Sequence, residues 1–244
     1  MQHISKAQIK LIRSLQHKKF RDELGLFVAE GDKCINELRK GFELVHLYRA
    51  GENATETEIA QMSGLKTPQG SIGVFIKPSE VSIQYSDLVL ALDGIQDPGN
   101  LGTIIRTCDW FGVKQIVCSR ETADCYNPKV VQATMGALAR VKLIYTDLEP
   151  FLQAEKAKST HIFGTLLDGK NMYEVLRDRC ADSVRNTEHR LIIFGNEGNG
   201  ISPEVRTYIT HPIRIPSYPE GAETSESLNV AIATAIVLAE FRRP

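Results

Sequence analysis

The sequence feature that most constrains the fold is a regular alternation of short apolar runs and helix-like stretches that begins near residue 87. Strands are expected at residues 88–92, 115–118, 141–145, 161–167, 191–194 and 212–215. Helices are expected between and after them at residues 101–111, 128–140, 148–158, 171–180, 203–209 and 228–241. Apolar strands that alternate with helices predict a mostly parallel sheet covered on both faces.

The segment before this alternation predicts a smaller α/β unit. Helices are expected at residues 5–16, 32–40 and 56–62, and strands at 27–30, 44–48 and 73–76. Gly41 follows the second helix and is expected to cap it in the left-handed conformation. The texture of the sequence changes over residues 77–87, and 244 residues are enough for two domains. We therefore expect one domain at residues 1–82 and a second at 83–244.

Composition and charge narrow the class of protein. Hydrophobic residues make up 42% of the chain and charged residues 24%, which excludes a disordered or fibrous protein. No apolar run approaches the roughly 20 residues of a membrane helix, and none resembles a signal peptide. The net charge of −1 gives no reason to expect a polyanion such as DNA. We expect a cytoplasmic protein with neither a membrane nor DNA among its partners.

Charge is nevertheless uneven along the chain. The first 21 residues contain no acid and carry the basic residues Lys6, Lys10, Arg13, Lys18, Lys19 and Arg21. A local basic face can bind phosphates even when the whole chain is close to neutral. A solvated helix face explains the same residues, and charge alone favours that simpler interpretation.

Cysteine and histidine usage points away from disulfides and metals. The five cysteines form no C-x-x-C pair, and several lie in apolar stretches: Cys34, Cys108, Cys118, Cys125 and Cys180. An odd number of cysteines in such positions is typical of reduced, packed thiols. The six histidines lack the spacing of metal ligands, so we expect no metal site.

The first candidate site, residues 93–106, is a glycine- and proline-rich turn followed by a helix expected to start near Asn100. Exposed N–H groups at the start of a helix favour an anion such as phosphate. Arg106 lies about a turn and a half further along, where its guanidinium group could bind a phosphate through two hydrogen bonds. An ordinary turn with Asn100 as the helix cap and Arg106 paired to an acid explains the same residues.

The second candidate site follows the strand expected at residues 191–194. Residues 195–200 hold three glycines with the spacing G-x-x-G-x-G, which differs from the G-x-G-x-x-G of dinucleotide-binding sites. The glycines indicate either positive φ angles or a close approach of the backbone to a ligand. Glu197 is the only charged residue of this loop, and a flexible turn is the alternative explanation.

The third candidate site combines Ile215 and Pro216 with Ser227, Leu228 and Asn229 at the start of the last helix. Ser227 as the helix cap is a sufficient structural explanation for the serine. Asn229 is harder to explain, because an amide in the first turn of a buried helix needs hydrogen-bond partners.

One near match to a nucleotide-binding loop is rejected. Residues 164–171 resemble the pattern G-x-x-x-x-G-K-[ST], but Asn171 stands where the magnesium-binding hydroxyl should be. Leu166 and Leu167 are typical of a strand, and Asp168-Gly169 is explained more simply as a turn. No G-x-S-x-G nucleophile elbow occurs in the sequence.

Taken together, the three candidate sites resemble the SpoU (TrmH-type) family of RNA ribose 2′-O-methyltransferases, within the SPOUT superfamily. Residues 100–108 match the family pattern N-x-G-x-x-x-R-x-A except at Cys108, and residues 194–201 match the second motif closely. Residues 215–216 and 227–231 match the third motif, with Ala231 in place of a frequent serine. Residues 27–31 and 66–70 are similar to the family's substrate-binding domain, a ribosomal-protein-like α/β RNA-binding fold.

This resemblance implies a SPOUT fold: an α/β domain with a mostly parallel sheet and a C-terminal trefoil knot, preceded by the smaller substrate-binding domain. It implies S-adenosylmethionine as the cofactor, and a homodimer with active sites at its interface. It implies RNA as the partner, with ribosomal RNA favoured over transfer RNA. The residues that would surround the reacting ribose are Asn100, Arg106, Glu197, Ser227 and Asn229. The residues whose backbone groups would hold the cofactor are Leu166, Gly195, Ile215 and Leu228.

Methyl transfer to a ribose hydroxyl is an in-line displacement, so positioning supplies much of the rate enhancement. Arg106 is often assigned as the base in this family. Guanidinium groups, however, normally stay protonated in proteins. We therefore favour a role in which Arg106 clamps an RNA phosphate and stabilises the developing alkoxide by its charge. Glu197 would orient Asn100 or Arg106, and the sequence does not decide between them.

Two other classes of function stay open. A non-catalytic RNA-binding protein of the same fold is one, although the sequence retains both Arg106 and Asn229. A nicotinamide-dependent enzyme is the other, and it predicts a G-x-G-x-x-G motif after the first strand of the sheet, which is not found. Binding of S-adenosylmethionine and transfer of its methyl group to RNA would separate these possibilities.

Overall fold

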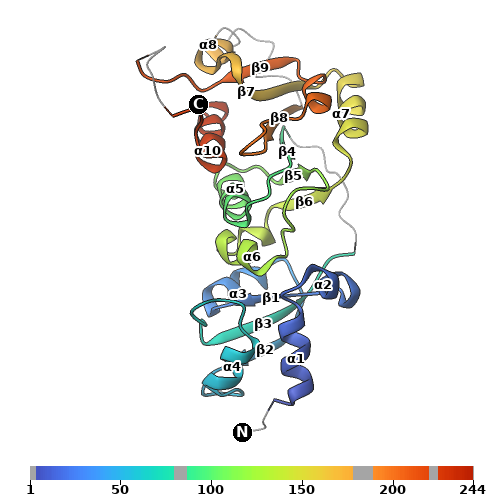
Figure 1. Cartoon of the computed structure of the whole chain (residues 1–244), viewed down its shortest axis with the longest axis vertical. Helices are drawn as coiled ribbons and strands as arrows, with labels where there is room; N and C mark the ends of the chain where they lie inside the picture. The colour runs from blue at the N-terminus through green and yellow to red at the C-terminus, as the bar shows by residue number, and fades with distance from the viewer. Residues whose placement is uncertain (1–3, 80–86, 178–188, 220–224, 244) are drawn as a thin grey trace.

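The computed structural model describes residues 4–79, 87–177, 189–219 and 225–243. Two β-sheets lie one above the other along the long axis of the molecule, with the N-terminal sheet at the lower end in Figure 1. The expected boundary between residues 82 and 83 falls outside the described residues, so the division into two domains stays a prediction. Among the described residues, no helix has the length and apolar character that crossing a membrane requires.

The N-terminal unit is a three-stranded antiparallel sheet with four helices. Its strands, in the order β1-β3-β2, are β1 (Leu26–Glu30), β2 (Leu44–Arg49) and β3 (Ser71–Ile76). Its helices are α1 (Lys6–Ser14), α2 (Lys18–Leu24), α3 (Asp32–Leu38) and α4 (Glu56–Met62). The side chains of Ser5 and Thr55 form capping boxes at the starts of α1 and α4.

The sequence analysis missed one helix of this unit and placed one helix cap wrongly. The helix α2 was not expected from the sequence; it ends at Gly25, whose φ of 64° provides the left-handed cap. The cap expected at Gly41 does not form, because α3 ends at Leu38 and Arg39 follows in the right-handed helical conformation. Gly41 is instead required by packing: a Cβ atom there would lie 2.5 Å from the backbone oxygen of Ala139.

The second unit contains the six-stranded parallel sheet predicted from the alternating pattern. Its strand order is β6-β5-β4-β8-β7-β9, and the register places Leu92 beside Phe194 and beside Cys118. The strands are β4 (Leu88–Asp93), β5 (Gln115–Cys118), β6 (Lys142–Tyr145), β7 (His161–Asn171), β8 (Arg190–Gly195) and β9 (His211–Arg214). The α/β fold class is confirmed, and the trefoil knot stays a prediction.

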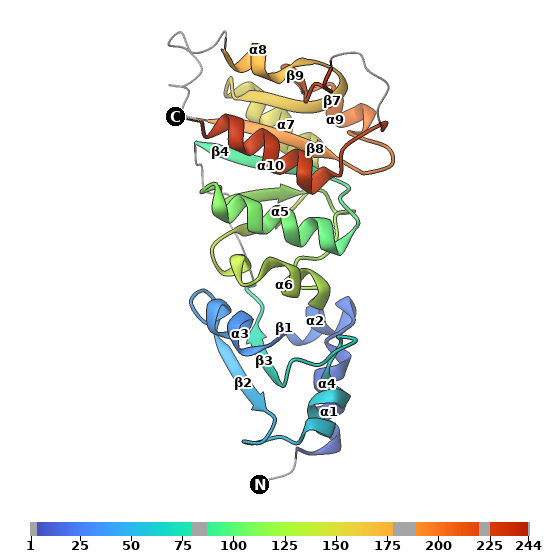
Figure 2. The ribbon, with the colours of Figure 1, turned by 90° about the vertical axis from the view of Figure 1, so that its left-hand side faces the viewer.

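Helices and connections cover both faces of this sheet (Figures 1 and 2). They are α5 (Pro98–Trp110), α6 (Pro128–Thr134), the 3₁₀ helix η1 (Ala137–Ala139), α7 (Leu148–Ala157), α8 (Met172–Arg177), α9 (Pro203–Arg206) and α10 (Val230–Phe241). The single helix expected at residues 128–140 is wrong, because Met135 and Gly136 take left-handed conformations with φ of 52° and 91° and break it. Cys180, expected at the end of α8, lies outside the described residues.

The strand β7 is longer than expected and carries an irregularity. Its pairing with β9 shifts in register between Thr165 and Lys170, so the turn expected at Asp168-Gly169 is an interruption within the strand. Gly169 is needed there, because a Cβ atom would lie 2.5 Å from the backbone carbon of Ile213. The Walker-like sequence is therefore part of a strand and forms no phosphate-binding loop.

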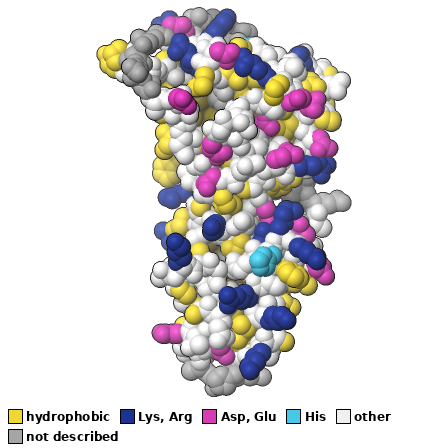
Figure 3. All heavy atoms as spheres, in the orientation of Figure 1, with side chains coloured by type: hydrophobic (Ala, Val, Ile, Leu, Met, Phe, Trp, Pro, Cys, Tyr) yellow, Lys and Arg dark blue, Asp and Glu magenta, His cyan; other side chains and the backbone are white. Residues whose placement is uncertain are grey.

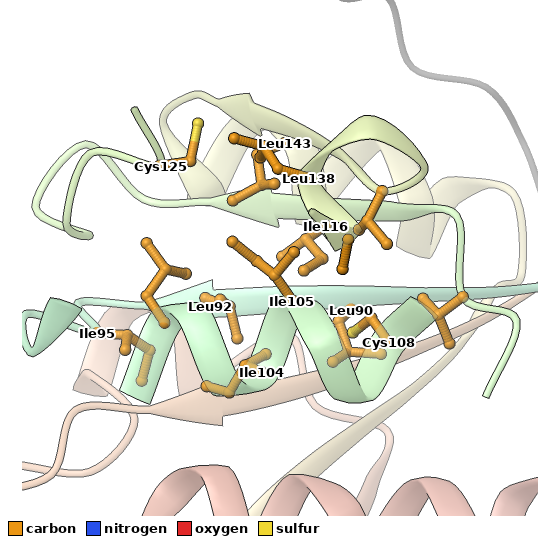
Figure 4. Close-up of a cluster of buried hydrophobic side chains, with 14 of the residues drawn as sticks. Leu90, Leu92, Ile95, Ile104, Ile105, Cys108, Ile116, Cys125, Leu138 and Leu143 are labelled. Atoms are coloured by element: carbon orange, nitrogen blue, oxygen red, sulfur yellow. The ribbon is translucent and has the colours of Figure 1, made fainter. Parts of the chain in front are cut away.

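The core of the second unit forms between the central strands and α5 (Figure 4). Leu90 and Leu92 of β4 pack with Ile104 and Ile105 of α5, and all four side chains are fully buried. Helix α6 packs on α5 where Gly102 leaves room; a Cβ atom on Gly102 would lie 2.4 Å from that of Ala133. This close packing fixes α5, and with it the residues that α5 presents at the edge of the sheet.

The two units share one continuous core and a buried ion pair. Phe27 of β1 stacks on Phe75 of β3 and also contacts Tyr126 of the second unit. Arg21 of α2, only 2% exposed, donates to Asp124 of the second unit at 2.7 Å and to the backbone oxygen of Leu15. Removing one partner of a buried ion pair leaves an uncompensated charge. The shared core and the buried ion pair therefore hold the two units in one arrangement.

We predict that Arg21→Ala lowers the free energy of unfolding by about 3–5 kcal/mol, because it leaves Asp124 without its cation at a buried position. Arg120→Ala is the matched control, since Arg120 pairs with Asp147 on the surface, where such a pair contributes up to about 1 kcal/mol. Urea denaturation of both variants provides the measurement. Equal losses of stability would show that the interface does not depend on the buried pair.

Candidate functional site

The first motif forms the turn between β4 and α5. Gly94, with φ of 72°, reverses the chain after Asp93, and its N–H donates to the hydroxyl of Ser119 at 3.0 Å. The side chain of Asp97 caps α5 by accepting from the N–H of Asn100 at 2.7 Å. The cap is thus Asp97, which the sequence analysis did not single out. The amide side chain of Asn100 remains available for contacts outside its own helix.

The side chain of Asn100 connects the three motifs. Its Nδ2 donates to Oε1 of Glu197 at 2.9 Å, and its Oδ1 accepts from Nδ2 of Asn229 at 2.9 Å. These residues lie 97 and 129 positions from Asn100 in the sequence. The expectation that the three motifs meet is confirmed for these three side chains. Because the amide is used both as donor and as acceptor, its orientation is fixed.

Asn229 also explains the start of the last helix. Its Oδ1 accepts from the N–H groups of Ala231 at 3.0 Å and Ile232 at 3.3 Å, so Asn229 is the cap of α10. The expectation that Ser227 caps this helix was wrong, because the helix begins at Val230 and leaves Ser227 exposed outside it. The sequence analysis expected hydrogen-bond partners for the amide of Asn229. These are the first N–H groups of its own helix and the side chain of Asn100.

The second motif is a closed loop after β8. Asn196 and Gly200 exchange two backbone hydrogen bonds of 2.9 Å, and Gly200 has φ of 68°. A Cβ atom on Gly195 would lie 2.2 Å from the backbone of Gly200 and Ile201. The glycines are therefore explained by the folding of the loop itself: positive φ at Gly200 and close backbone approach at Gly195.

Asn196 joins this loop to the first motif, a role that the sequence analysis missed. Its Nδ2 donates to the backbone oxygen of Gly94 at 2.7 Å, and its Oδ1 accepts from the N–H groups of Gly198 and Asn199. Asp93 strengthens the same junction by accepting from the N–H of Ser202 at 2.8 Å. An asparagine between two glycines at the end of a strand was the available signal, because such amides commonly bond to nearby backbone groups.

Arg106 lies on the exposed side of α5, in the second turn after Asn100. Among the described residues, no acidic side chain pairs with its guanidinium group. The explanation in which Arg106 is paired to an acid therefore does not hold for this part of the chain. Arg106 also makes no hydrogen bond to Asn100, Glu197 or Asn229, so its positive charge is free to meet an anion from solution.

Three of the four residues expected to hold a cofactor lie in or directly after three neighbouring strands, β7, β8 and β9. In open α/β sheets, ligands bind at the carboxyl edge of the strands. Gly195 ends β8, Ile215 follows β9, and Leu166 lies in β7. The ladder between β7 and β8 stops at Gly164, so Leu166 lies beyond it, in the register shift between β7 and β9. Its backbone groups are thus outside the regular ladder and suited to a small polar ligand.

The described cysteine thiols are not available as reactive groups, because they are buried. Burial raises the pKa of the Cys34 thiol to about 11 and that of Cys125 to about 12, so both are protonated at neutral pH. The described part of the chain contains no group of three or more histidine, cysteine or acidic side chains arranged to hold a metal ion. The chemistry available at the site is therefore that of fixed amides, one carboxylate and one free guanidinium.

Comparison with known proteins identifies this arrangement. A model of the SpoU rRNA methylase family matches residues 87–239, which includes all three motifs. The chain belongs to the SpoU rRNA methylase family. A model of the MRM3-like substrate-binding domain matches residues 6–63 of the N-terminal unit. The resemblance found in the sequence is confirmed, and it extends to both units of this SpoU protein.

Individual relatives agree with the family assignment. The 23S rRNA (guanosine(2553)-2′-O)-methyltransferase RlmP of Bacillus subtilis is 27% identical over an alignment of 250 positions, gaps included, which covers 96% of this chain and 96% of that protein. A solved TrmH-family structure from Porphyromonas gingivalis has a TM-score of 0.87 and 37% identity, covering 98% of both chains. An AdoMet-bound rRNA methyltransferase from Sinorhizobium meliloti has a TM-score of 0.83 and 29% identity, covering 99% and 97%.

We predict that Gly195→Ala destabilises this SpoU protein by about 1–3 kcal/mol, because the added methyl group overlaps the backbone of the same loop. Gly198→Ala is the control, since a Cβ atom there meets only Oδ1 of Asn196, at 3.4 Å. Urea denaturation measures both variants. If Gly195→Ala were as stable as Gly198→Ala, the loop geometry described here would be incorrect.

Proposed function

We propose that this protein transfers the methyl group of S-adenosylmethionine to a ribose 2′-hydroxyl of ribosomal RNA. The observation that carries the proposal is the hydrogen-bonded set of Glu197, Asn100 and Asn229. Arg106, in the second turn of α5 after Asn100, adds a charge that no described residue pairs with. The family, an rRNA methylase family, supports the reaction and the substrate class. The AdoMet-bound relative and the 2′-O-methyltransferase relative support the cofactor and the reacting atom.

The residues at the strand ends fit the cofactor. Leu166 and Ile215 are half-buried and apolar, and Leu166 offers backbone groups outside the sheet ladder. Gly195 has no side chain to fill the space beside them, and Leu228 is 48% exposed at the start of α10. We assign binding of S-adenosylmethionine to these four residues. When bound, the cofactor supplies an electrophilic methyl group on a positively charged sulfur.

The chain itself supplies orientation and charge. Asn100 is held between Glu197 and Asn229, so its amide is presented in one orientation to a ribose hydroxyl. Glu197 accepts from Asn100, which supports a role in which Glu197 orients Asn100 rather than Arg106. Arg106 holds an RNA phosphate and stabilises the oxygen as it becomes negative. We assign to Ser227, which is exposed next to Leu228, a hydroxyl contact with the same ribose.

The test is transfer of a labelled methyl group from S-adenosylmethionine to RNA taken from a strain that lacks this enzyme, followed by mapping of the modified nucleotide. We expect label in ribosomal RNA at a ribose 2′-oxygen. Label in transfer RNA instead would correct the substrate, and saturable RNA binding without any label would identify a non-catalytic RNA-binding protein.

The role of Arg106 is tested in the same assay with Arg106→Lys. This change keeps the charge and removes the forked geometry, so we expect turnover to fall by about 100-fold, in the range found when a fixed charge-stabilising donor is lost. Arg39→Lys is the control, because Arg39 is exposed and forms no ion pair with the described residues. Near-normal turnover of Arg106→Lys would refute the bidentate clamp.

We also propose that the protein is a homodimer whose interface includes α10 and α5. Trp110 is 85% exposed at the end of α5, and Ile232 of α10 is 53% exposed beside Leu228. Large apolar side chains exposed on two helices that pack side by side indicate a contact surface. We predict that the wild-type protein sediments with about twice the 27.2 kDa mass of one chain. Ile232→Lys is expected to shift it to the monomer, and a monomeric wild type would contradict the proposal.

A further inference from the structure

A loop outside the three motifs holds the turn that begins the first of them. The β5–α6 loop, residues 119–127, is bound to that turn by backbone hydrogen bonds. The N–H of Ser119 donates to the backbone oxygen of Leu92 at 2.9 Å, and the N–H of Ala123 donates to that of Ile95 at 2.8 Å. The loop thus binds the turn where β4 ends and again just before α5 begins.

Two buried hydroxyl groups of the loop complete this attachment. The N–H of Gly94 donates to Oγ of Ser119 at 3.0 Å, and Oγ of Ser119 lies 3.3 Å from Oγ1 of Thr122. Because Oγ1 of Thr122 donates its own proton to the backbone oxygen of Leu92, at 3.2 Å, Ser119 is the donor between the two hydroxyls. Both side chains are only 5% exposed. The hydrogen bonds therefore run in one direction, from Gly94 through both hydroxyls to Leu92.

The turn is held from its other side by the second motif. The backbone oxygen of Gly94 accepts from Nδ2 of Asn196 at 2.7 Å, so both polar groups of this glycine are bound. A glycine with φ of 72° has no side chain to restrict it, and these hydrogen bonds are what fix its position. Helix α5 starts at Pro98, four residues later, and presents Asn100 to Glu197. The amide of Asn100 therefore takes its position from the bonds made at Gly94.

The β5–α6 loop is itself fixed at its centre. The hydroxyl of Tyr145, at the end of β6, donates to the backbone oxygen of Ala123 at 2.6 Å and accepts from the N–H of Cys125 at 2.8 Å. Asp124, which lies between these two residues, pairs with the buried Arg21 of the N-terminal unit. A loop that is held by a further strand and by the other unit imposes its position on the turn and does not follow it.

We propose that Ser119 and Thr122 are positioning residues for methyl transfer: their hydroxyls fix the turn at Gly94 and so hold the amide of Asn100 where the ribose must lie. This inference rests on the proposed function and adds to it two residues outside the three motifs. Both side chains are buried, so they act through Gly94 and make no contact with RNA. In a reaction that depends on orientation, a small displacement of a positioned group lowers the rate.

The two hydroxyls contribute nothing to the charged surface that attracts RNA. On the face drawn in Figure 3, Lys and Arg side chains gather mainly over the N-terminal half of the molecule. Ser119 and Thr122 are neutral and buried. Attraction of a polyanion depends on exposed cations. Substitutions that remove only one of these hydroxyls should therefore change kcat and leave KM for RNA as it is.

The test measures kcat and KM for methyl transfer to ribosomal RNA from a strain that lacks the enzyme. Ser119→Ala and Thr122→Val remove a hydroxyl, whereas Thr122→Ser keeps it. Thr134→Val is the matched control, because Thr134 is also buried and lies at the end of α6. Its Oγ1 accepts from the N–H of Gly136 at 3.3 Å and donates to the backbone oxygen of Val131 at 2.8 Å, so the control loses the same kinds of hydrogen bond.

We expect kcat to fall about tenfold in Ser119→Ala and in Thr122→Val, the rate factor that corresponds to one lost hydrogen bond. The conservative variant Thr122→Ser should restore the kcat of the wild type, and Thr134→Val should keep it. The double variant Ser119→Ala/Thr122→Val should be about as slow as either single variant, because the two hydroxyls act as one unit. KM for RNA and the dissociation constant of S-adenosylmethionine should match those of the wild type throughout, which also shows that the variants are folded.

Three kinetic results would overturn the inference. Equal kcat values for Thr122→Val and Thr122→Ser would show that the hydroxyl is not used. An equal fall in Thr134→Val would show that the loss of activity reflects a general loss of stability. A change in KM for RNA with an unchanged kcat would place the loop in RNA binding instead of in positioning.

Amide hydrogen exchange, measured by mass spectrometry, separates this inference from the proposed function. Residues 94–100 should exchange faster in Ser119→Ala than in the wild type or in Thr134→Val, because the N–H of Gly94 loses its acceptor. If the wild-type protein transfers no methyl group, the proposed function fails, yet faster exchange in this segment would leave the positioning of the turn by Ser119 standing. Unchanged exchange would overturn the inference whichever reaction the protein carries out.

Discussion

The amide of Asn100 is the interaction on which the arrangement of the site depends. It donates to Glu197 in the loop after β8 and accepts from Asn229 at the start of α10. Each of these partners has a structural reason of its own to be where it is. Asn229 caps its helix, and Glu197 lies in a loop closed by Asn196 and Gly200. The candidate site is therefore assembled by side chains that also complete the fold.

A second constraint comes from the join between the two units. Aromatic packing of Phe27 against Tyr126 and the buried pair of Arg21 with Asp124 make the N-terminal sheet part of the same rigid body as the catalytic sheet. In an enzyme that acts on a large folded RNA, such rigidity has a functional consequence: contacts far from the reacting ribose position the substrate for chemistry.

The glycines show how far reasoning from sequence carries. Their spacing in the second motif indicated either positive φ or close approach, and both occur, at Gly200 and Gly195 respectively. The close approach, however, is to the loop's own backbone. Gly41 was assigned to a helix cap, yet it makes room for Ala139 of the other unit, 98 residues away in the chain. The local sequence pattern indicates that a glycine is needed at a position. Only the tertiary contacts show which atoms occupy the space that a side chain would fill.

By itself the sequence determined the element types of the catalytic sheet and the three motifs, because apolar periodicity and turn residues are local properties. It did not determine that Asp97 and Asn229, rather than Asn100 and Ser227, cap their helices, since each segment offers several side chains able to cap. Nor did it determine the partners of Asn100. Those were decided by the order of the strands, which places β8 beside β4 and brings residues about one hundred positions apart into hydrogen-bond contact.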